Sequence, residues 1–127
     1  MSDTEIEGWS SLIDWFGHSP NFHDAEVVSV DLRREPEPSA IRVHAWRTNA
    51  DVDANRVFRR DRHATVTFTI SGITTLRLDA WTHQNVLYKL WVSGAEGEYT
   101  LHMPSSYGME GEISATAISV SVEPREA

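Results

Sequence analysis

Cysteine is absent from the 127 residues of this chain, and its absence removes three kinds of chemistry. Disulfide-stapled folds, zinc sites with thiolate ligands and thiol nucleophiles are all excluded. Long hydrophobic runs are also absent, because no apolar stretch approaches the roughly 20 residues that a transmembrane helix needs. The first residues are acidic and lack the apolar core of a signal peptide. These absences predict a cytoplasmic protein that does not bind membranes.

Basic residues are scarce, since 11 Lys and Arg stand against 19 Asp and Glu and give a net charge of -8. Such a chain repels phosphate backbones, so nucleic acid is not an expected partner. The acidic residues gather toward both ends, whereas residues 42–62 hold six Arg against three Asp. Acidic proteins are steered toward basic partners, although most of them are simply soluble proteins. The charge alone therefore favours an ordinary soluble acidic protein, and a basic partner is the alternative that it leaves open.

Hydrophobic residues make up 40% of the chain, enough for one domain of residues 1–127 to bury a core without metal or disulfide. Apolar residues at helical spacing predict a helix at about residues 5–16, with Asp3 or Thr4 as its cap and Gly17 at its end. Residues from about 24 to 123 alternate polar and apolar side chains as strands do. The sequence predicts an α+β fold, mainly an antiparallel curled β-sheet with a short N-terminal helix.

The individual strands can be placed from this alternation. We expect strands at residues 41–46, 64–70, 76–81, 86–92, 99–103 and 112–123, besides a first strand after residue 24. Ser71-Gly72 predicts a turn, residues 47–63 an exposed loop or ragged hairpin, and residues 104–108 a loop. The first and last strands change phase by one residue, through a bulge or by passing from one covered face to another. Either cause bends the strand, which is why a curled sheet is expected.

Six histidines and many carboxylates raise the alternative of a metal-binding or small-molecule-binding module, or of a hydrolase. Asp24 and Glu26 point the same way if they lie on a strand, and His23 can join them from the loop. His44 and His102 share the outward parity of their strands, which allows a site of two His and one carboxylate. However, no local metal motif, nucleophile elbow or phosphate-binding loop is present. We therefore expect no metal, cofactor or catalytic residue, and expect His23 and Asp24 to hold the helix-to-strand corner through backbone amides.

The polar side of the predicted sheet carries aromatic residues that a solvated face does not usually hold. Trp46, Trp81 and Trp91 all lie on it, together with Arg47 and Arg77. Trp and Arg are the residue types that most often anchor protein interfaces, so this face is a candidate partner-binding surface. Two alternatives stay open: a second layer covers the Trp side chains, or a homodimer buries them.

Several short motifs follow one another along the chain. They are the Trp9 helix, Phe22-His23-Asp24-Ala25-Glu26-Val27, an Arg/Asp-rich middle, Val66-Thr67-Phe68 with Gly72-Ile73, His83-Gln84-Asn85-Val86-Leu87, and Ser106-Tyr107-Gly108-Met109-Glu110-Gly111. This ordered set resembles the immunity protein 50 family over about residues 9–124. The resemblance implies a small α+β protein, encoded beside a polymorphic bacterial toxin, that binds and neutralises its cognate toxin without being an enzyme.

The resemblance also marks individual positions but supplies no catalytic residues. The marked residues are His23, Asp24, Glu26, His83, Gln84, Asn85, Tyr107, Gly108 and Glu110. We place Glu110 with the partner-binding candidates Trp46, Trp81, Trp91, Arg47 and Arg77, and expect the other marked residues to hold the fold. The expected partner is a cognate protein toxin, basic because this chain is acidic.

Overall fold

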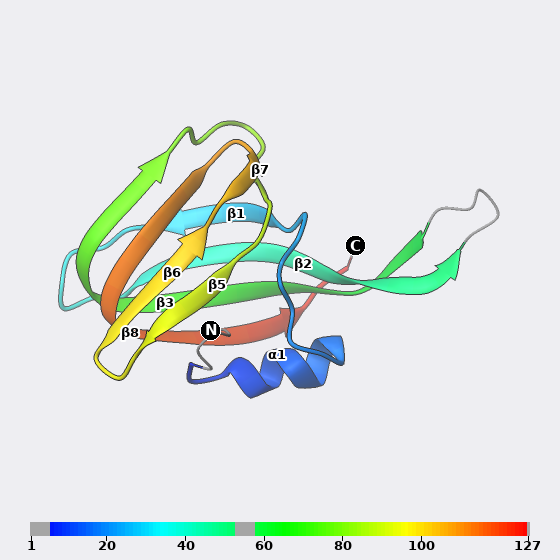
Figure 1. Ribbon diagram of the computed structural model, residues 1–127, viewed down its shortest axis with the longest axis horizontal. Helices are drawn as coiled ribbons and strands as arrows, with labels where there is room; N and C mark the ends of the chain where they lie inside the picture. The colour runs from blue at the N-terminus through cyan, green and yellow to red at the C-terminus, as the bar shows by residue number, and fades with distance from the viewer. Residues whose placement is uncertain (1–5, 53–57, 127) are drawn as a thin grey trace.

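One short helix and eight strands make up the part of the chain that the computed structural model describes, residues 6–52 and 58–126. The elements are α1 (Trp9–Phe16), β1 (Glu26–Asp31), β2 (Ser39–Val52), β3 (Phe58–Asp79), β4 (Val86–Leu87), β5 (Trp91–Ala95), β6 (Glu98–Met103), β7 (Ser105–Tyr107) and β8 (Glu110–Pro124). The strands pair antiparallel in one open sheet, in the order β5-β6-β8-β3-β2-β1-β4-β7 (Figure 1). The predicted α+β fold with a mainly antiparallel sheet is confirmed.

The sheet curls because two long strands, β3 and β8, bend together. They pair along most of their length, starting where Ala64 lies opposite Pro124. β3 bends at Gly72, where φ is 69° and a Cβ atom would collide with the hydroxyl of Thr116 on β8. Beyond this bend, β5 and β6 pass in front of β1, β2 and β3 in Figure 1, and buried side chains from both halves of the sheet form one core.

Both strands that change phase in the sequence bend, but for different reasons. In β1 the cause is a bulge at Val28, because the register against β2 shifts between Val27 and Ser29. In β8, Ala115 and Ile118 are both buried although they are three residues apart, and both pair with β3 without a shift between them. β8 therefore passes from one covered face to another where β3 bends, which is the second of the two predicted causes.

The prediction of a turn at Ser71-Gly72 is wrong, because β3 continues through these residues as a bent strand. At residues 47–63 the hairpin alternative is correct, since β2 and β3 remain paired as far as Val52 with Phe58. This end of the hairpin extends beyond the rest of the sheet in Figure 1. At this end β2 no longer pairs with β1, because the pairing of β1 with β2 ends at His44.

The predicted strand at residues 86–92 is divided in the structure. β4 ends at Leu87 and β5 begins at Trp91, and the two strands lie near opposite ends of the sheet order. Between them, the N–H of Tyr88 donates to the carbonyl oxygen of Pro104 (2.9 Å), and the N–H of Leu90 donates to that of Asn21 (3.0 Å). Because these two bonds go to different segments, residues 86–92 do not form one continuous strand. Residues 104–108, predicted as a loop, contain the short strand β7.

Helix α1 packs onto the sheet through aromatic rings. Trp9 stands edge-on to Phe22 with ring centroids 6.3 Å apart, and Phe22 stands edge-on to Phe68 of β3 at 5.8 Å. Leu12 and Phe16 are buried beside them. The apolar stripe predicted from helical spacing therefore faces the core.

The predicted start of the helix at about residue 5 is wrong, because α1 begins at Trp9. Glu7 instead forms a β-bridge with Ser119 of β8. Gly8 joins the bridge to the helix with a φ of 90°, in a place where a Cβ atom would collide with the carbonyl oxygen of Val120. The chain is held against β8 at this point, so the helix can start only after Gly8.

The end of the helix agrees with the prediction. Gly17 adopts a left-handed conformation, and its N–H donates to the carbonyl oxygen of Ile13 (2.8 Å). Asp3 and Thr4, the predicted caps of the other end, lie outside the described residues. In the described ranges, no helix combines the length and the apolar character needed to cross a membrane.

Arg62 of β3 fastens α1 to the sheet. Its Nε donates to the carbonyl oxygen of Trp15 (2.9 Å), the indole N–H of Trp15 donates to the carbonyl oxygen of Arg62 (2.8 Å), and the guanidinium carbon lies 3.6 Å from the indole centroid. We expect Arg62→Ala to lower the free energy of unfolding by about 1 kcal/mol, because it removes one hydrogen bond and the cation–π contact. Urea unfolding followed by Trp fluorescence measures the change. The control is Arg34→Ala in an exposed loop, and equal effects of the two substitutions would contradict the expectation.

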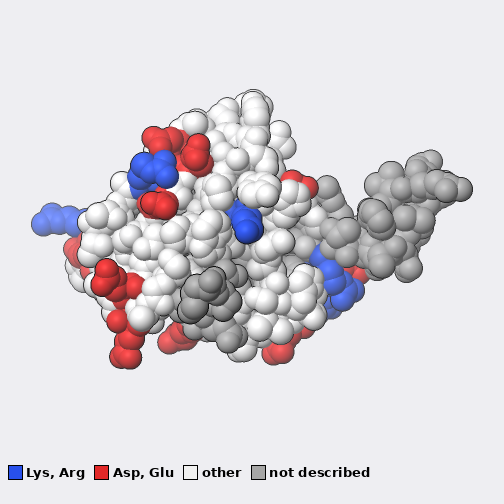
Figure 2. All heavy atoms as spheres, viewed as in Figure 1, with Lys and Arg blue, Asp and Glu red and all other residues white. Residues whose placement is uncertain are grey.

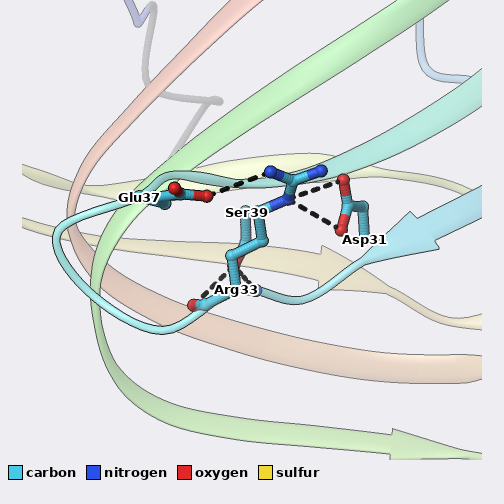
Figure 3. A network of polar contacts seen from close by, with 4 residues as sticks. All are labelled: Asp31, Arg33, Glu37 and Ser39. Carbon is cyan, nitrogen blue, oxygen red and sulfur yellow. Dashed lines mark hydrogen bonds and ion pairs between the residues drawn. The ribbon is translucent and has the colours of Figure 1, made fainter.

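Arg33 closes the connection between β1 and β2 (Figure 3). Its Nε donates to both carboxylate oxygens of Asp31 at 3.1 Å, and its Nη1 donates to Glu37 at 3.0 Å. The hydrogen bond to Asp31, followed by the one to Glu37, raises the pKa of Arg33. The buried hydroxyl of Ser39 accepts from the N–H of Arg33 (2.8 Å), which fixes the start of β2.

Candidate functional site

The partner-binding candidates do not share one face of the molecule. Four of the six border two hollows in different halves of the sheet: Trp46 borders one, and Trp91, Arg77 and Glu110 border the other. Arg47 borders a cavity that adjoins the first hollow. The parity pattern placed the three Trp and two Arg candidates on one side, and Glu110 was added from the resemblance. Because the bend in β3 and β8 directs the inner faces of both halves toward one core, their outer faces point in different directions.

The first hollow, here called the Trp46 hollow, has a volume of about 340 Å³ and is lined by Asp24, Glu26, His44, Trp46, Gln84 and Val86. Glu26 of β1 lies opposite His44 of β2 on one side and Val86 of β4 on the other, so the three side chains stand in a row. Trp46 follows His44 on the same face of β2. An adjoining cavity of about 210 Å³ shares Asp24 and Trp46 and is also lined by His23 and Arg47.

Aromatic rings pack together at the edge of this hollow. The ring centroids of His44 and Trp46 are 5.2 Å apart, and those of Trp46 and His63 are 6.0 Å apart. A hydrogen bond of 3.0 Å joins Nε2 of His44 to Nδ1 of His63. His63 was not a candidate in the sequence because it fell in the segment taken as a loop. His63 lies two residues before Thr65 on the same strand, so both side chains point outward. This alternation is the sequence signal that could have identified His63.

Asp24 reaches the Trp46 hollow from a corner of the chain. It was expected on a strand, but its φ is 66° and β1 begins only at Glu26. The N–H of Asp24 donates to the carbonyl oxygen of Leu87 (2.9 Å), and Nδ1 of His23 donates to that of Tyr88 (2.9 Å). Nε2 of His23 lies 3.6 Å from the Asp24 carboxylate. His23 and Asp24 thus hold the corner, but through carbonyl oxygens where backbone amides were expected.

Arg47 is paired within the protein. Its Nε and Nη2 donate to the two carboxylate oxygens of Asp61 on β3, both at 2.9 Å. The hydrogen bond to Asp61 raises the pKa of Arg47. The bidentate pair braces β2 against β3 where the hairpin leaves the sheet, so Arg47 has a structural task at the edge of the site.

The second hollow, here called the Trp91 hollow, has a volume of about 180 Å³ and lies over β3, β5, β6 and β8. Trp91 stacks on His102 with centroids 4.6 Å apart and planes 11° apart, and Nζ of Lys89 lies 5.4 Å from the Trp91 ring. Arg77 donates to Asp79 at 2.7 Å. That hydrogen bond raises the pKa of Arg77, and the charges of Glu112 and Glu110 raise it further. Trp91, Arg77 and Glu110 are therefore brought together, as members of an internally paired group.

His102 has hydrogen-bond partners on both ring nitrogens. Its Nε2 lies 2.6 Å from the hydroxyl of Ser93, and its Nδ1 lies 3.2 Å from the carboxylate of Glu112. A hydroxyl, an imidazole and a carboxylate in this order also occur in serine hydrolases. Ser93, however, is not among the residues that line the Trp91 hollow, where a substrate would lie. We therefore assign the hydroxyl to orienting His102 beneath Trp91.

Two of the marked residues form a buried junction between loops. Asn85 is 2% exposed, and its Oδ1 accepts from the N–H groups of Thr82 (3.0 Å) and Met109 (2.8 Å) while its Nδ2 donates to the carbonyl oxygen of Thr82 (2.9 Å). Gly108 has a φ of 77° directly beside this amide. The Asn85 amide thus joins the loop at Thr82 to the start of β8 at Met109.

The remaining marked residues divide between the fold and the surface. The rings of His83 and Tyr107 pack edge to face with centroids 6.2 Å apart, next to the Asn85 junction. Asp24, Glu26 and Gln84 instead line the Trp46 hollow. Trp81 follows β3, is 55% exposed and borders neither hollow.

Charges and histidines do not converge as the metal alternative requires. His44 and His102 lie on β2 and β6, which β8 and β3 separate. Across residues 6–52 and 58–126, no three His, Asp or Glu side chains are grouped so that they could hold a metal ion. On the face shown in Figure 2, acidic and basic side chains lie in small separate clusters between uncharged areas. The net charge is therefore not spread as a continuous acidic layer over that face.

Comparison with known proteins gives one match. A family model described as Immunity protein 50 matches residues 8–124, nearly the whole chain. No curated protein and no solved structure is significantly similar to it.

Proposed function

Because the chain belongs to the immunity protein 50 family, we propose that it binds a cognate bacterial toxin and neutralises it without catalysing a reaction. The match over residues 8–124 is the observation that carries this proposal. Binding alone suffices for such a role, since a bound protein can cover an active site or prevent a motion that the toxin needs. The producing cell's cytoplasm is the compartment in which this protection is required.

The surface chemistry supports a protein partner. Trp46 and Trp91 are only half-buried, and each lies beside Arg, His and carboxylate groups at a hollow. Aromatic side chains in a hollow provide a large contact area at small entropic cost, and charged groups at the rim select the partner and speed association. The net charge of -8 favours a basic toxin.

Coexpression with the toxin encoded beside this gene tests the proposal. We expect cells that carry both proteins to survive and cells that carry the toxin alone to die. We further expect Trp46→Ala to weaken toxin binding by at least about tenfold, as the loss of an aromatic anchor does, and so to reduce survival. Trp81→Ala is the matched control, since Trp81 is exposed outside both hollows.

Two outcomes separate the parts of this proposal. Cell death despite abundant, folded wild-type protein would reject neutralisation of that toxin. Full protection by Trp46→Ala together with lost protection in Trp81→Ala would keep the function and move the binding surface to the end of β3. Circular dichroism of both variants verifies that they fold.

A further inference from the structure

We propose that the Trp46 hollow receives an arginine side chain of the toxin, held between the Trp46 ring and the carboxylates of Asp24 and Glu26. The inference rests on the proposed function and adds both the place of binding and the chemistry of the partner group. Four observations support it: the state of Glu26, the state of Asp24, the shape of the hollow and the contrast with the Trp91 hollow.

Glu26 is a half-buried carboxylate without a partner in the described residues. It stands between Val86 and His44 on the outer face of the sheet. Among the side chains and backbone groups that the structure describes, none makes a hydrogen bond or ion pair with its carboxylate. Partial burial removes water from a charge without replacing it, so a cation from outside would supply the missing interaction.

Asp24 adds a second carboxylate to the same hollow. Its side chain is 50% exposed, and its nearest charged neighbour is His23 at 3.6 Å. Two acidic groups that line one hollow attract a single cation more strongly than either does alone.

The Trp46 ring indicates which cation fits. A guanidinium group is planar, stacks on an indole ring and presents paired N–H donors to a carboxylate, whereas an ammonium group is a compact, strongly hydrated charge. Gln84 lines the same hollow, and its side-chain amide can accept or donate a further hydrogen bond. A volume of about 340 Å³ accommodates a long side chain from outside. Arginine therefore fits this group of residues better than lysine does.

The Trp91 hollow differs because cationic side chains of this chain already lie in it or beside it. Glu112 contacts His102 at 3.2 Å, and Arg77 contacts Asp79 at 2.7 Å. Lys89 already occupies the position of a cation beside the Trp91 ring, 5.4 Å from its centroid. A cation from a partner would compete there with Arg77 and Lys89, whereas none of the described residues that line the Trp46 hollow is Lys or Arg.

The first experiment does not depend on any toxin. The full chain, labelled with 15N, is titrated with N-acetyl-arginine methylamide at millimolar concentrations, and in parallel with the lysine and glutamine analogues. We expect saturable shifts of the Trp46 indole and Gln84 amide signals with the arginine compound, weaker shifts with lysine and none with glutamine. Loss of the shifts in Glu26→Gln would support the site. Absence of saturable shifts, or equal shifts in Glu26→Gln, would overturn it whatever the toxin does.

The second experiment measures the dissociation constant for the toxin encoded beside the gene. We expect Glu26→Gln and Asp24→Asn each to raise it by at least about tenfold, because each removes a charge that faces the cation. Asn tolerates the left-handed backbone of residue 24, so Asp24→Asn preserves the corner. Glu98→Gln is the control, since it removes the same charge from an exposed position on β6.

The two experiments distinguish the inference from the function on which it rests. Tight binding by the wild type, with no change in Glu26→Gln and Asp24→Asn, would overturn the arginine site and leave neutralisation intact. A wild type that neither binds nor protects would reject the function for that toxin. In the toxin, one Arg→Ala substitution should weaken binding, and its effect should disappear when Glu26 is already Gln.

Discussion

Replacing Asn85 with Ala is expected to lower the free energy of unfolding by about 4 kcal/mol, because several backbone groups lose their partner at once. Oδ1 of Asn85 accepts from Thr82 and Met109, and its Nδ2 donates to Thr82. The Met109 N–H is buried, so water cannot replace the lost bond. A domain of this size has about 5–15 kcal/mol of stability in total, so the loss would be a large share of it.

Urea unfolding of purified variants measures this effect. Gln84→Ala is the control in the same loop, and we expect it to change the free energy of unfolding by less than about 0.5 kcal/mol because Gln84 is exposed. Asn85→Asp should also be destabilising, since it buries a charge and places a carboxylate oxygen against the Thr82 carbonyl oxygen to which Nδ2 donates. Equal stability of the Asn85→Ala and Gln84→Ala proteins would show that the junction does not hold the loops.

Replacing Gly108 with Ala is expected to destabilise the protein by about 3 kcal/mol or more, from backbone strain and overpacking together. The φ of Gly108 is 77°, and a Cβ atom there would lie 2.5 Å from the carbonyl oxygen of Gln84 and 2.6 Å from Oδ1 of Asn85. Neither atom can withdraw freely, because one belongs to the backbone and the other to the buried amide. The turn between β7 and β8 would therefore have to move.

Gly97 provides a matched control for this substitution. Its φ is 82°, nearly the same as that of Gly108, but a Cβ atom there would have no neighbour within 4 Å. Gly97→Ala should therefore show the backbone strain alone, about 1 kcal/mol. Thermal unfolding of both variants compares the two costs. Similar losses in the two proteins would mean that the space around Gly108 is not limiting.

Most of the fold could be predicted because alternation along a strand reports burial directly. Val66, Phe68 and Ile70 have the correct parity and are buried. The errors arose where backbone pairing departs from local pattern. The sequence pattern at Gly72 is typical of a turn. In the structure, its positive φ bends β3, which pairs with β8 both before and after this residue. The start of the helix was misplaced because Glu7 pairs with a residue more than 100 positions away, Ser119.

The site was harder to predict than the fold because it depends on how distant segments approach one another. Parity correctly indicated Trp46 and Trp91 as outward residues, but parity alone cannot show that the curl separates them. Gln84 was marked only by a resemblance, and Glu26 also as a member of the alternative His/carboxylate cluster. Both were expected to hold the fold, whereas both line a hollow. Glu26 and Gln84 lie near each other because β1 pairs with β4. The strand β4 has only two residues, which are too few for a recognisable strand pattern in the sequence.

The long pairing of β3 with β8 sets an order of events in the cell. Ala64 pairs with Pro124, so the central ladder cannot be completed until the ribosome has made residue 124. Ladders between such distant segments also form slowly compared with helices. Under the proposed function, an emerging chain would give no protection. The cell would have to keep a reserve of finished copies before the toxin arrives, so the timing of synthesis would matter as much as affinity.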